Sequence, residues 1–120
     1  MLGIKNSINK NIKSYGYALK GIYMLFEENN FRIQLLAATI AISLGFRLGI
    51  TADHWLIIIA CIGVVLMAEA GNTALEKLCD HLHPQQHEVI GKVKDLSAGA
   101  VLIVAFAAAI IGTMVFWQYF

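Results

Sequence analysis

Long apolar runs and short polar segments alternate along the chain. Residues 55–68 are almost entirely apolar, residues 96–116 contain no charged side chain, and a shorter apolar run covers residues 35–46. A helix of about 20 mostly apolar residues crosses the hydrocarbon core of a bilayer, and a shorter run needs its flanking residues to do so. The pattern predicts three membrane-spanning helices, at residues 29–49, 54–81 and 91–118.

The first part of the chain has a different periodicity. In residues 4–27, one apolar side chain recurs every three or four positions, and Lys10, Lys13 and Lys20 point elsewhere. This spacing predicts an amphipathic helix that lies along an anionic membrane surface. The periodicity alone also fits a helix that only anchors the chain to the membrane surface and has no catalytic role. The segment has no apolar core of a signal peptide, so we expect it to remain in the mature protein.

Short polar segments separate these helices. Residues 27–30 form the expected turn into the membrane, and Pro84 disfavours helix at the residue before it. Gly45 and Gly49 form a G-x-x-x-G pattern, which either brings helices close together or only marks the loop that follows. Thr51 is a candidate N-cap for the second spanning helix.

Composition agrees with a membrane protein. Of 120 residues, 58% are hydrophobic and one is proline, which is too apolar for an ordinary soluble domain. The fold class predicted is a single-domain (residues 1–120), all-α integral membrane protein with an N-terminal surface helix. Nucleic acid is not an expected partner, because no basic patch lies outside membrane-proximal stretches.

Positive residues predict the orientation. The N-terminal lysines, Lys77, Lys92 and Lys94 fall on one side of the membrane, and Arg47 alone falls on the other. Since positive residues concentrate in cytoplasmic loops, the N-terminus should be cytoplasmic and the C-terminus outside.

The candidate chemistry begins where the second apolar run ends, at Glu69. The next polar residues, Asn72, Thr73, Glu76 and Asp80, share one helix face with it. At a rise of about 1.5 Å per residue, Glu69 lies about 21 Å beyond Trp55, near the cytoplasmic edge of the bilayer. Burying a carboxylate at this depth is costly, so this face indicates a function beyond folding.

Three interpretations of this face are open. The charges could form solvated ion pairs in a structural adaptor. Alternatively, paired carboxylates could bind Mg²⁺ and phosphates while a buried Glu positions a lipid hydroxyl; no P-loop or protein-kinase glycine motif is present. An ion or proton pathway lacks a continuous polar path, because the third spanning helix has no ionisable residue after Asp95 and the first has none between Arg32 and Arg47.

Several motifs resemble one family. The most specific is A-E-x-x-N-T-A-x-E at residues 68–76, which is followed by Asp80, Pro84, His87, Lys94-Asp95 and A-G-A-V-L at residues 98–102. Weaker matches lie at residues 12–21 and 28–32. Together they resemble the small prokaryotic diacylglycerol kinases, a family that includes the undecaprenol kinases, over nearly the whole chain.

This resemblance implies a homotrimeric helical bundle in the bacterial cytoplasmic (inner) membrane. Each site, built from neighbouring protomers, would transfer the γ-phosphate of ATP, bound with Mg²⁺, to a membrane lipid hydroxyl. The resemblance also implies a role for each matching residue. Glu69 and Asn72 would be catalytic; Glu28 and Glu76 would bind the metal; Lys13, Tyr17, Glu28, Glu76, His87, Lys94 and Asp95 would bind nucleotide; and Arg32, Glu69 and Gly99 would contact the lipid.

Short sequence patterns predict which lipid alcohol is the substrate. Residues 98–100, 30–33 and 44–50 look more like the undecaprenol kinase branch than the diacylglycerol kinases of enterobacteria. We therefore expect undecaprenol as the lipid alcohol, with diacylglycerol as the alternative.

Overall fold

The computed structural model describes residues 2–120, which form helices and connecting turns and contain no strand. The four helices are α1 (Leu2–Leu25), α2 (Asn29–Leu48), α3 (Ala52–Leu82) and α4 (Glu88–Trp117). Three of them, α2, α3 and α4, are long and apolar enough to cross a membrane. The predicted all-α membrane fold is confirmed.

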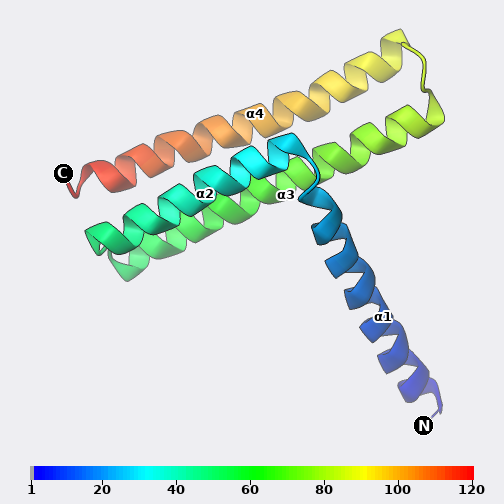
Figure 1. Cartoon of the computed structure of the whole chain (residues 1–120), viewed down its shortest axis with the longest axis horizontal. Helices are drawn as coiled ribbons and strands as arrows, with labels where there is room; N and C mark the ends of the chain where they lie inside the picture. Colours follow the sequence, from blue (N-terminus) through cyan, green and yellow to red (C-terminus); the bar gives the residue numbers. More distant parts are fainter. Residues whose placement is uncertain (1) are drawn as a thin grey trace.

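Helices α2, α3 and α4 run antiparallel to their neighbours in the chain and form an elongated bundle (Figure 1). Helix α3 is the central element, because it packs against both α2 and α4. A cluster of buried apolar side chains centres on Ile50, Ile58 and Val115, near the end where the C-terminus lies. The opposite end of the bundle carries the polar residues.

Helix α1 leaves this bundle at a steep angle and extends away from it (Figure 1). No side chain between Leu2 and Leu25 is buried within the chain. The turn that joins α1 to α2 makes contacts of its own: the rings of Phe26 and Phe31 meet edge to face at 5.6 Å, and Arg32 Nε donates a hydrogen bond to the carbonyl of Phe26. The exposed apolar side of α1 is therefore available to a membrane surface.

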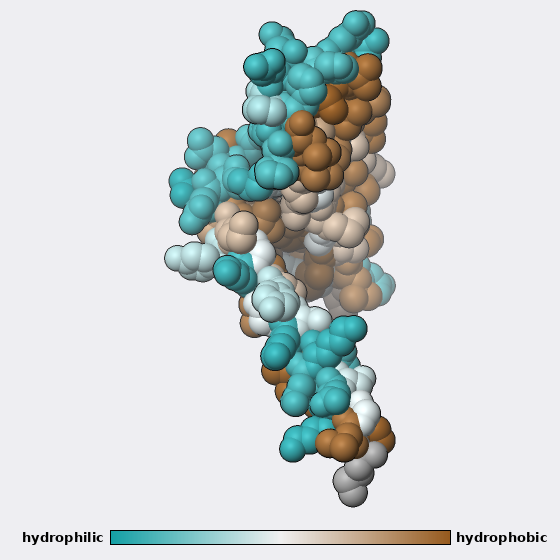
Figure 2. Space-filling model, turned by 90° about the vertical axis from the view of Figure 1, so that its right-hand side faces the viewer, coloured by the Kyte–Doolittle hydropathy of each residue, from teal (hydrophilic) through white to brown (hydrophobic). Residues whose placement is uncertain are grey.

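Helices α3 and α4 are longer than α2, so their polar end projects beyond it. Helix α3 has 31 residues and α4 has 30, against 20 in α2. At about 1.5 Å per residue, α3 is about 46 Å long and exceeds a hydrocarbon core of about 30 Å. Hydrophilic residues gather over the projecting α3–α4 end and along α1, while the flank of the bundle is hydrophobic (Figure 2).

The two glycines of the G-x-x-x-G pattern have separate roles at the other end. Gly49 adopts φ 62° as the C-cap of α2, a left-handed conformation that glycine accommodates best. Gly45 lets α2 approach Trp55 of α3, since a Cβ on Gly45 would lie 2.7 Å from Trp55 Cη2. Thr51 caps α3 by accepting a hydrogen bond from the backbone N–H of His54.

Candidate functional site

The candidate site is built on the polar face of α3, which we define as Glu69, Asn72, Thr73, Glu76 and Asp80. Its first residues are deeply buried: Glu69 is 3% exposed and Asn72 is 5% exposed. Asn72 Nδ2 donates a hydrogen bond to Glu76 Oε1 over 3.2 Å, one helical turn further along. This contact holds the half-buried Glu76 carboxylate against α3.

Two features of this face indicate that a ligand completes it. Asn72 Oδ1 is buried and has no hydrogen-bond partner among the described residues. The carboxylates of Glu69 and Glu76 lie on the same face of α3, two turns apart, and neither has an ion-pair partner among the described residues. Buried acceptors are normally hydrogen-bonded, and a buried carboxylate is normally paired with a cation or protonated.

A small cavity of about 190 Å³ opens beside Glu69. Polar side chains line it on the side of α2, where Asn30 and Gln34 lie one turn apart, and small or apolar residues line it on the side of α4. The α4 residues are Ala98, Val101, Leu102 and Ala105. The cavity therefore places one carboxylate and two amides against an apolar wall, which suits a lipid head group with a hydroxyl.

An apolar cleft of about 250 Å³ continues from this cavity between α2, α3 and α4. The two spaces share Gln34 and Ala105, and the cleft extends along the bundle as far as Phe116. Alanine residues make up much of its wall. A narrow apolar space that leads from Glu69 into the membrane matches the hydrocarbon chain of a lipid alcohol.

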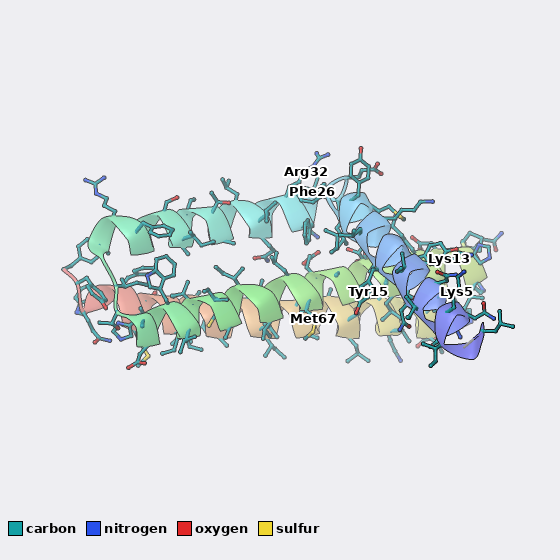
Figure 3. The ribbon with its side chains drawn as sticks, turned by 90° about the horizontal axis from the view of Figure 1, so that it is seen from below. Lys5, Lys13, Tyr15, Phe26, Arg32 and Met67 are labelled. Carbon is teal, nitrogen blue, oxygen red and sulfur yellow. The ribbon has the colours of Figure 1, made fainter. Side chains whose placement is uncertain are left out.

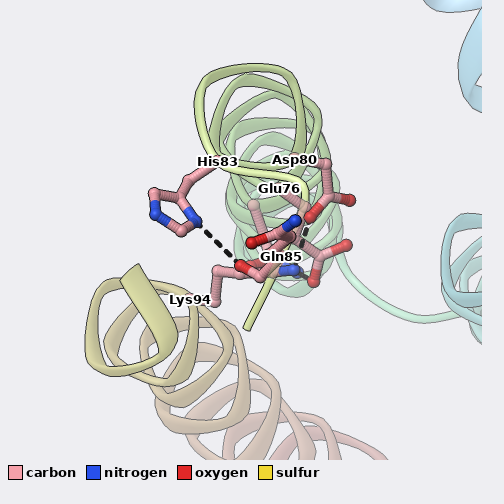
Figure 4. Close-up of polar contacts among 6 residues, drawn as sticks. Glu76, Asp80, His83, Gln85 and Lys94 are labelled. Atoms are coloured by element: carbon pink, nitrogen blue, oxygen red, sulfur yellow. Dashed lines mark hydrogen bonds and ion pairs between the residues drawn. The ribbon is translucent and has the colours of Figure 1, made fainter. Parts of the chain in front are cut away.

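Two ion pairs connect the polar end of α3 to neighbouring elements. Lys77 Nζ lies 3.1 Å from Glu28 Oε1, which joins α3 to the α1–α2 turn. Lys94 Nζ lies 2.6 Å from Asp80 Oδ1, which joins α3 to α4 beside Glu76 (Figure 4). Both lysines thus hold their ammonium groups at the polar end of α3, where an anionic ligand would be attracted.

The α3–α4 loop is held by histidines. His87 is the N-cap of α4, and its Nδ1 accepts hydrogen bonds from the backbone N–H groups of Val89 and Ile90. Its ring lies 4.7 Å from that of His83, whose Nδ1 is 2.9 Å from the carbonyl oxygen of Gln85 (Figure 4). Because Nδ1 of His87 acts as an acceptor, the proton of the neutral ring is on Nε2, where it can be donated to a ligand.

Several other residues predicted for the site do not lie at the Glu69 cavity in the described chain. Lys13 and Tyr17 are exposed on α1. This helix extends away from the bundle (Figure 1), and Figure 3 labels Lys13 on it. Asp95 and Gly99 line a separate groove on α4, together with Leu96 and Ala100. Arg32 is bonded to the α1–α2 turn rather than to the Glu69 cavity.

The donors on the polar face fit Mg²⁺ only if the metal arrives with phosphates. Among residues 2–120, no three His, Cys, Asp or Glu side chains lie close enough to hold a metal ion by themselves. Glu76 offers a carboxylate and Asn72 Oδ1 an unpartnered oxygen on the same face of α3, and Glu28 offers a second carboxylate at the start of α2, where it is paired with Lys77. One or two carboxylates plus substrate phosphates are the usual protein ligands of Mg²⁺ at phosphoryl-transfer sites.

Three residues of this region were not predicted from the sequence. Asn30 and Gln34 line the Glu69 cavity, and Lys77 pairs with Glu28. Asn30 and Gln34 could have been found from the sequence, since polar residues four positions apart on an otherwise apolar helix share a face. The contact between Lys77 and Glu28 could not have been found from the sequence, because it depends on how the α1–α2 turn folds back onto α3.

The chain matches one protein family over most of its length. A family model described as "Prokaryotic diacylglycerol kinase" matches residues 16–116. The Escherichia coli (strain K12) protein named diacylglycerol kinase is 30% identical over 110 residues, which cover 91% of this chain and 90% of that protein. Proteins of the same name from Haemophilus influenzae and Synechocystis sp. are 33% and 32% identical, covering 77% and 92% of this chain and 79% and 69% of their own lengths.

Proposed function

Because the chain belongs to the prokaryotic diacylglycerol kinase family, we propose that it transfers the γ-phosphate of ATP to the hydroxyl of a membrane lipid at the cytoplasmic face of the membrane. The chain is accordingly an ATP-dependent lipid kinase. The observation that best supports this site for the reaction is Glu69, a buried carboxylate that lines a cavity at the polar end of the bundle.

Glu69 is proposed as the residue that acts on the lipid. The lipid hydroxyl would enter the Glu69 cavity and donate a hydrogen bond to the carboxylate, with its hydrocarbon chain in the adjoining apolar cleft. As the hydroxyl oxygen bonds to the γ-phosphorus, the bond from that phosphorus to the β–γ bridging oxygen breaks and ADP leaves. The hydroxyl proton passes to Glu69, which acts as general base.

Glu28 and Glu76 are proposed to hold the Mg²⁺ that accompanies ATP. When bound, Mg²⁺ neutralises phosphate charge as the γ-phosphoryl group is transferred. Asn72 fixes Glu76 through its Nδ2 hydrogen bond and leaves Oδ1 free to accept one from a ligand. Lys94 and the Nε2–H of His87 would donate to the phosphates from the α4 side.

We propose that a homotrimer completes each site. Within one protomer, Lys13, Tyr17, Asp95 and Gly99 are separated from the Glu69 cavity, although they match family motifs. Helix α1 has no buried residue between Leu2 and Leu25, so its surface is free for a neighbouring protomer. In the trimer, the nucleotide-binding residues Lys13, Tyr17 and Asp95 would face the γ-phosphate, and Arg32 and Gly99 would contact lipid.

The bacterial cytoplasmic membrane is the proposed location. Three apolar helices and the family support a membrane protein of this kind. Lysines at the α1 and α3–α4 end favour a cytoplasmic N-terminus with the C-terminus outside.

Two lipid alcohols are candidates. Undecaprenol is favoured by the sequence patterns at residues 30–33, 44–50 and 98–100. Diacylglycerol is supported at least as well, since the named relatives are diacylglycerol kinases. The amides of Asn30 and Gln34 beside Glu69 add a specific reason to test diacylglycerol, because its ester carbonyls can accept hydrogen bonds that undecaprenol cannot.

The test is a phosphorylation assay with both alcohols side by side. Purified protein in mixed micelles with Mg-ATP should convert at least one of them to its phosphate, and the faster reaction identifies the lipid. The matched control is Glu69→Gln, which keeps the size of the side chain and removes its charge. Equal trace rates from the wild type and this variant would refute the kinase proposal.

A further inference from the structure

The ion pair between Lys77 and Glu28 occupies a carboxylate that the proposed function needs for Mg²⁺. Glu28 stands at the N-cap position of α2, yet within the described chain its side chain makes no capping hydrogen bond. Its carboxylate is instead directed to α3, where Lys77 Nζ lies 3.1 Å from Oε1. A lysine that is next to Glu76 in sequence thus neutralises Glu28 before any metal arrives.

The ion pair between Lys77 and Glu28 lies where Lys77 can readily leave Glu28 for another anionic partner. The side chains of Lys77 and Glu28 are 59% and 35% exposed, so the pair is largely solvated. Solvated ion pairs contribute little to stability, and the long lysine side chain can rotate away on its flexible stem. Lys94, the other lysine at this face, is already bonded to Asp80 at 2.6 Å.

A divalent cation and an ammonium group compete for the same oxygen. A metal held between Glu28 and Glu76 would displace Lys77 from Glu28, and the released ammonium would lie beside the phosphates that complete the coordination of the metal. Ammonium groups bind phosphate oxygens through charge-assisted hydrogen bonds. We propose that Lys77 is a nucleotide-positioning residue, which pairs with Glu28 in the free enzyme and binds the phosphates of a nucleoside triphosphate when the Mg²⁺ complex is bound. This inference rests on the proposed kinase function.

A purely structural role of the ion pair predicts different effects when Lys77 is replaced. If the pair only holds the α1–α2 turn against α3, loss of Lys77 would lower thermal stability and would weaken metal and nucleotide binding together. If Lys77 exchanges partners, its loss has opposite effects: the nucleotide binds more weakly, and the metal alone binds more tightly, because its competitor is gone.

The experiment compares Lys77→Met with Lys5→Met, which removes the same charge from the exposed start of α1. In the detergent-solubilised full chain, a fluorescent ATP analogue measures nucleotide affinity, paramagnetic resonance of free Mn²⁺ measures metal affinity without nucleotide, and thermal unfolding measures stability. For Lys77→Met we expect nucleotide affinity to fall about tenfold and Mn²⁺ affinity to rise about threefold. Lys5→Met should change neither affinity.

Lys77→Arg and Lys77→Gln complete the test. Arg keeps the positive charge and should restore most of the nucleotide affinity, while Gln should behave like Met and replaces it if the Met variant fails to fold. Unchanged nucleotide affinity in Lys77→Met or Lys77→Gln, with an active wild type, would overturn the role of Lys77 and leave the kinase function standing. A wild type that phosphorylates neither lipid would instead refute the function itself.

Discussion

Asn72 and Glu76 are bonded to one another across one turn of α3, with Asn72 Nδ2 donating to Glu76 Oε1 over 3.2 Å. The same amide buries its Oδ1 without a partner among the described residues. An unsatisfied buried acceptor destabilises a fold, so its presence here is better explained by a ligand than by stability. The relationship leads to a prediction in which stability and activity change in opposite directions.

Asn72→Leu should raise the thermal unfolding midpoint while it lowers activity. The substitution keeps the branched shape and the number of heavy atoms of the side chain, with bulkier methyl groups at its end, and it removes an unpartnered polar atom, whose burial costs about 1–3 kcal/mol. It also removes the hydrogen bond that fixes Glu76, so kcat should fall at least about tenfold. Thermal unfolding and a phosphorylation assay on the same preparation measure both effects. Wild-type activity in a folded Asn72→Leu protein would show that the amide has no part in the reaction.

Glu76→Gln should weaken the binding of Mg-ATP and leave the KM for lipid unchanged. The amide oxygen of Gln can still accept the hydrogen bond from Asn72, so the geometry is kept while the negative charge that attracts the metal is lost. The expected rise in KM for Mg-ATP is about tenfold, as for the loss of one charged contact; Glu28→Gln should behave in the same way.

Glu88→Gln is the matched control for these two variants. Glu88 is 83% exposed and its carboxylate lies 3.5 Å from Lys92, one turn along α4. Its loss should leave the KM for Mg-ATP at the wild-type value. A normal KM in Glu76→Gln and Glu28→Gln as well would contradict their assignment to the metal.

Gly45→Ala should destabilise the far end of the bundle without affecting catalysis. The added Cβ would lie 2.7 Å from Trp55 Cη2, so α2 and α3 would have to separate or the indole would have to shift. Overpacking of this kind costs about 1–3 kcal/mol, which thermal unfolding would detect. At Gly63 a Cβ meets nothing within 4 Å in the chain, so Gly63→Ala is the control. Equal midpoints for the two variants would mean that the close approach to Trp55 is unimportant.

The all-helical fold could be predicted because apolar runs and the periodicity of residues 4–27 are local properties. The contacts between helices could not be predicted from the sequence. The sequence left open whether Gly45 brings helices together, and the answer depends on Trp55, which lies ten positions further along. Similarly, Lys77 meets Glu28 only because the α1–α2 turn places residue 28 beside the projecting part of α3.

The candidate site was predicted in part. Glu69, Asn72 and Glu76 could be grouped from one helix, since residues three, four and seven positions apart share a face. The α4 residues could not be assigned in this way: Ala98 lines the Glu69 cavity, whereas its neighbour Gly99 lines a separate groove. Adjacent residues point about 100° apart on a helix, so the motif match alone did not show which of them faces Glu69.

The most direct test of the central claim is to measure phosphoryl transfer and nucleotide affinity together in Glu69→Gln. If Glu69 acts on the lipid hydroxyl at the membrane edge, turnover should fall by about 10²–10⁴-fold, the usual contribution of a general base. Affinity for the ATP analogue should stay within about twofold of the wild type, because the proposed metal ligands are Glu28 and Glu76. Wild-type turnover in this variant, or a loss of activity that is matched by an equal loss of nucleotide affinity, would contradict the account.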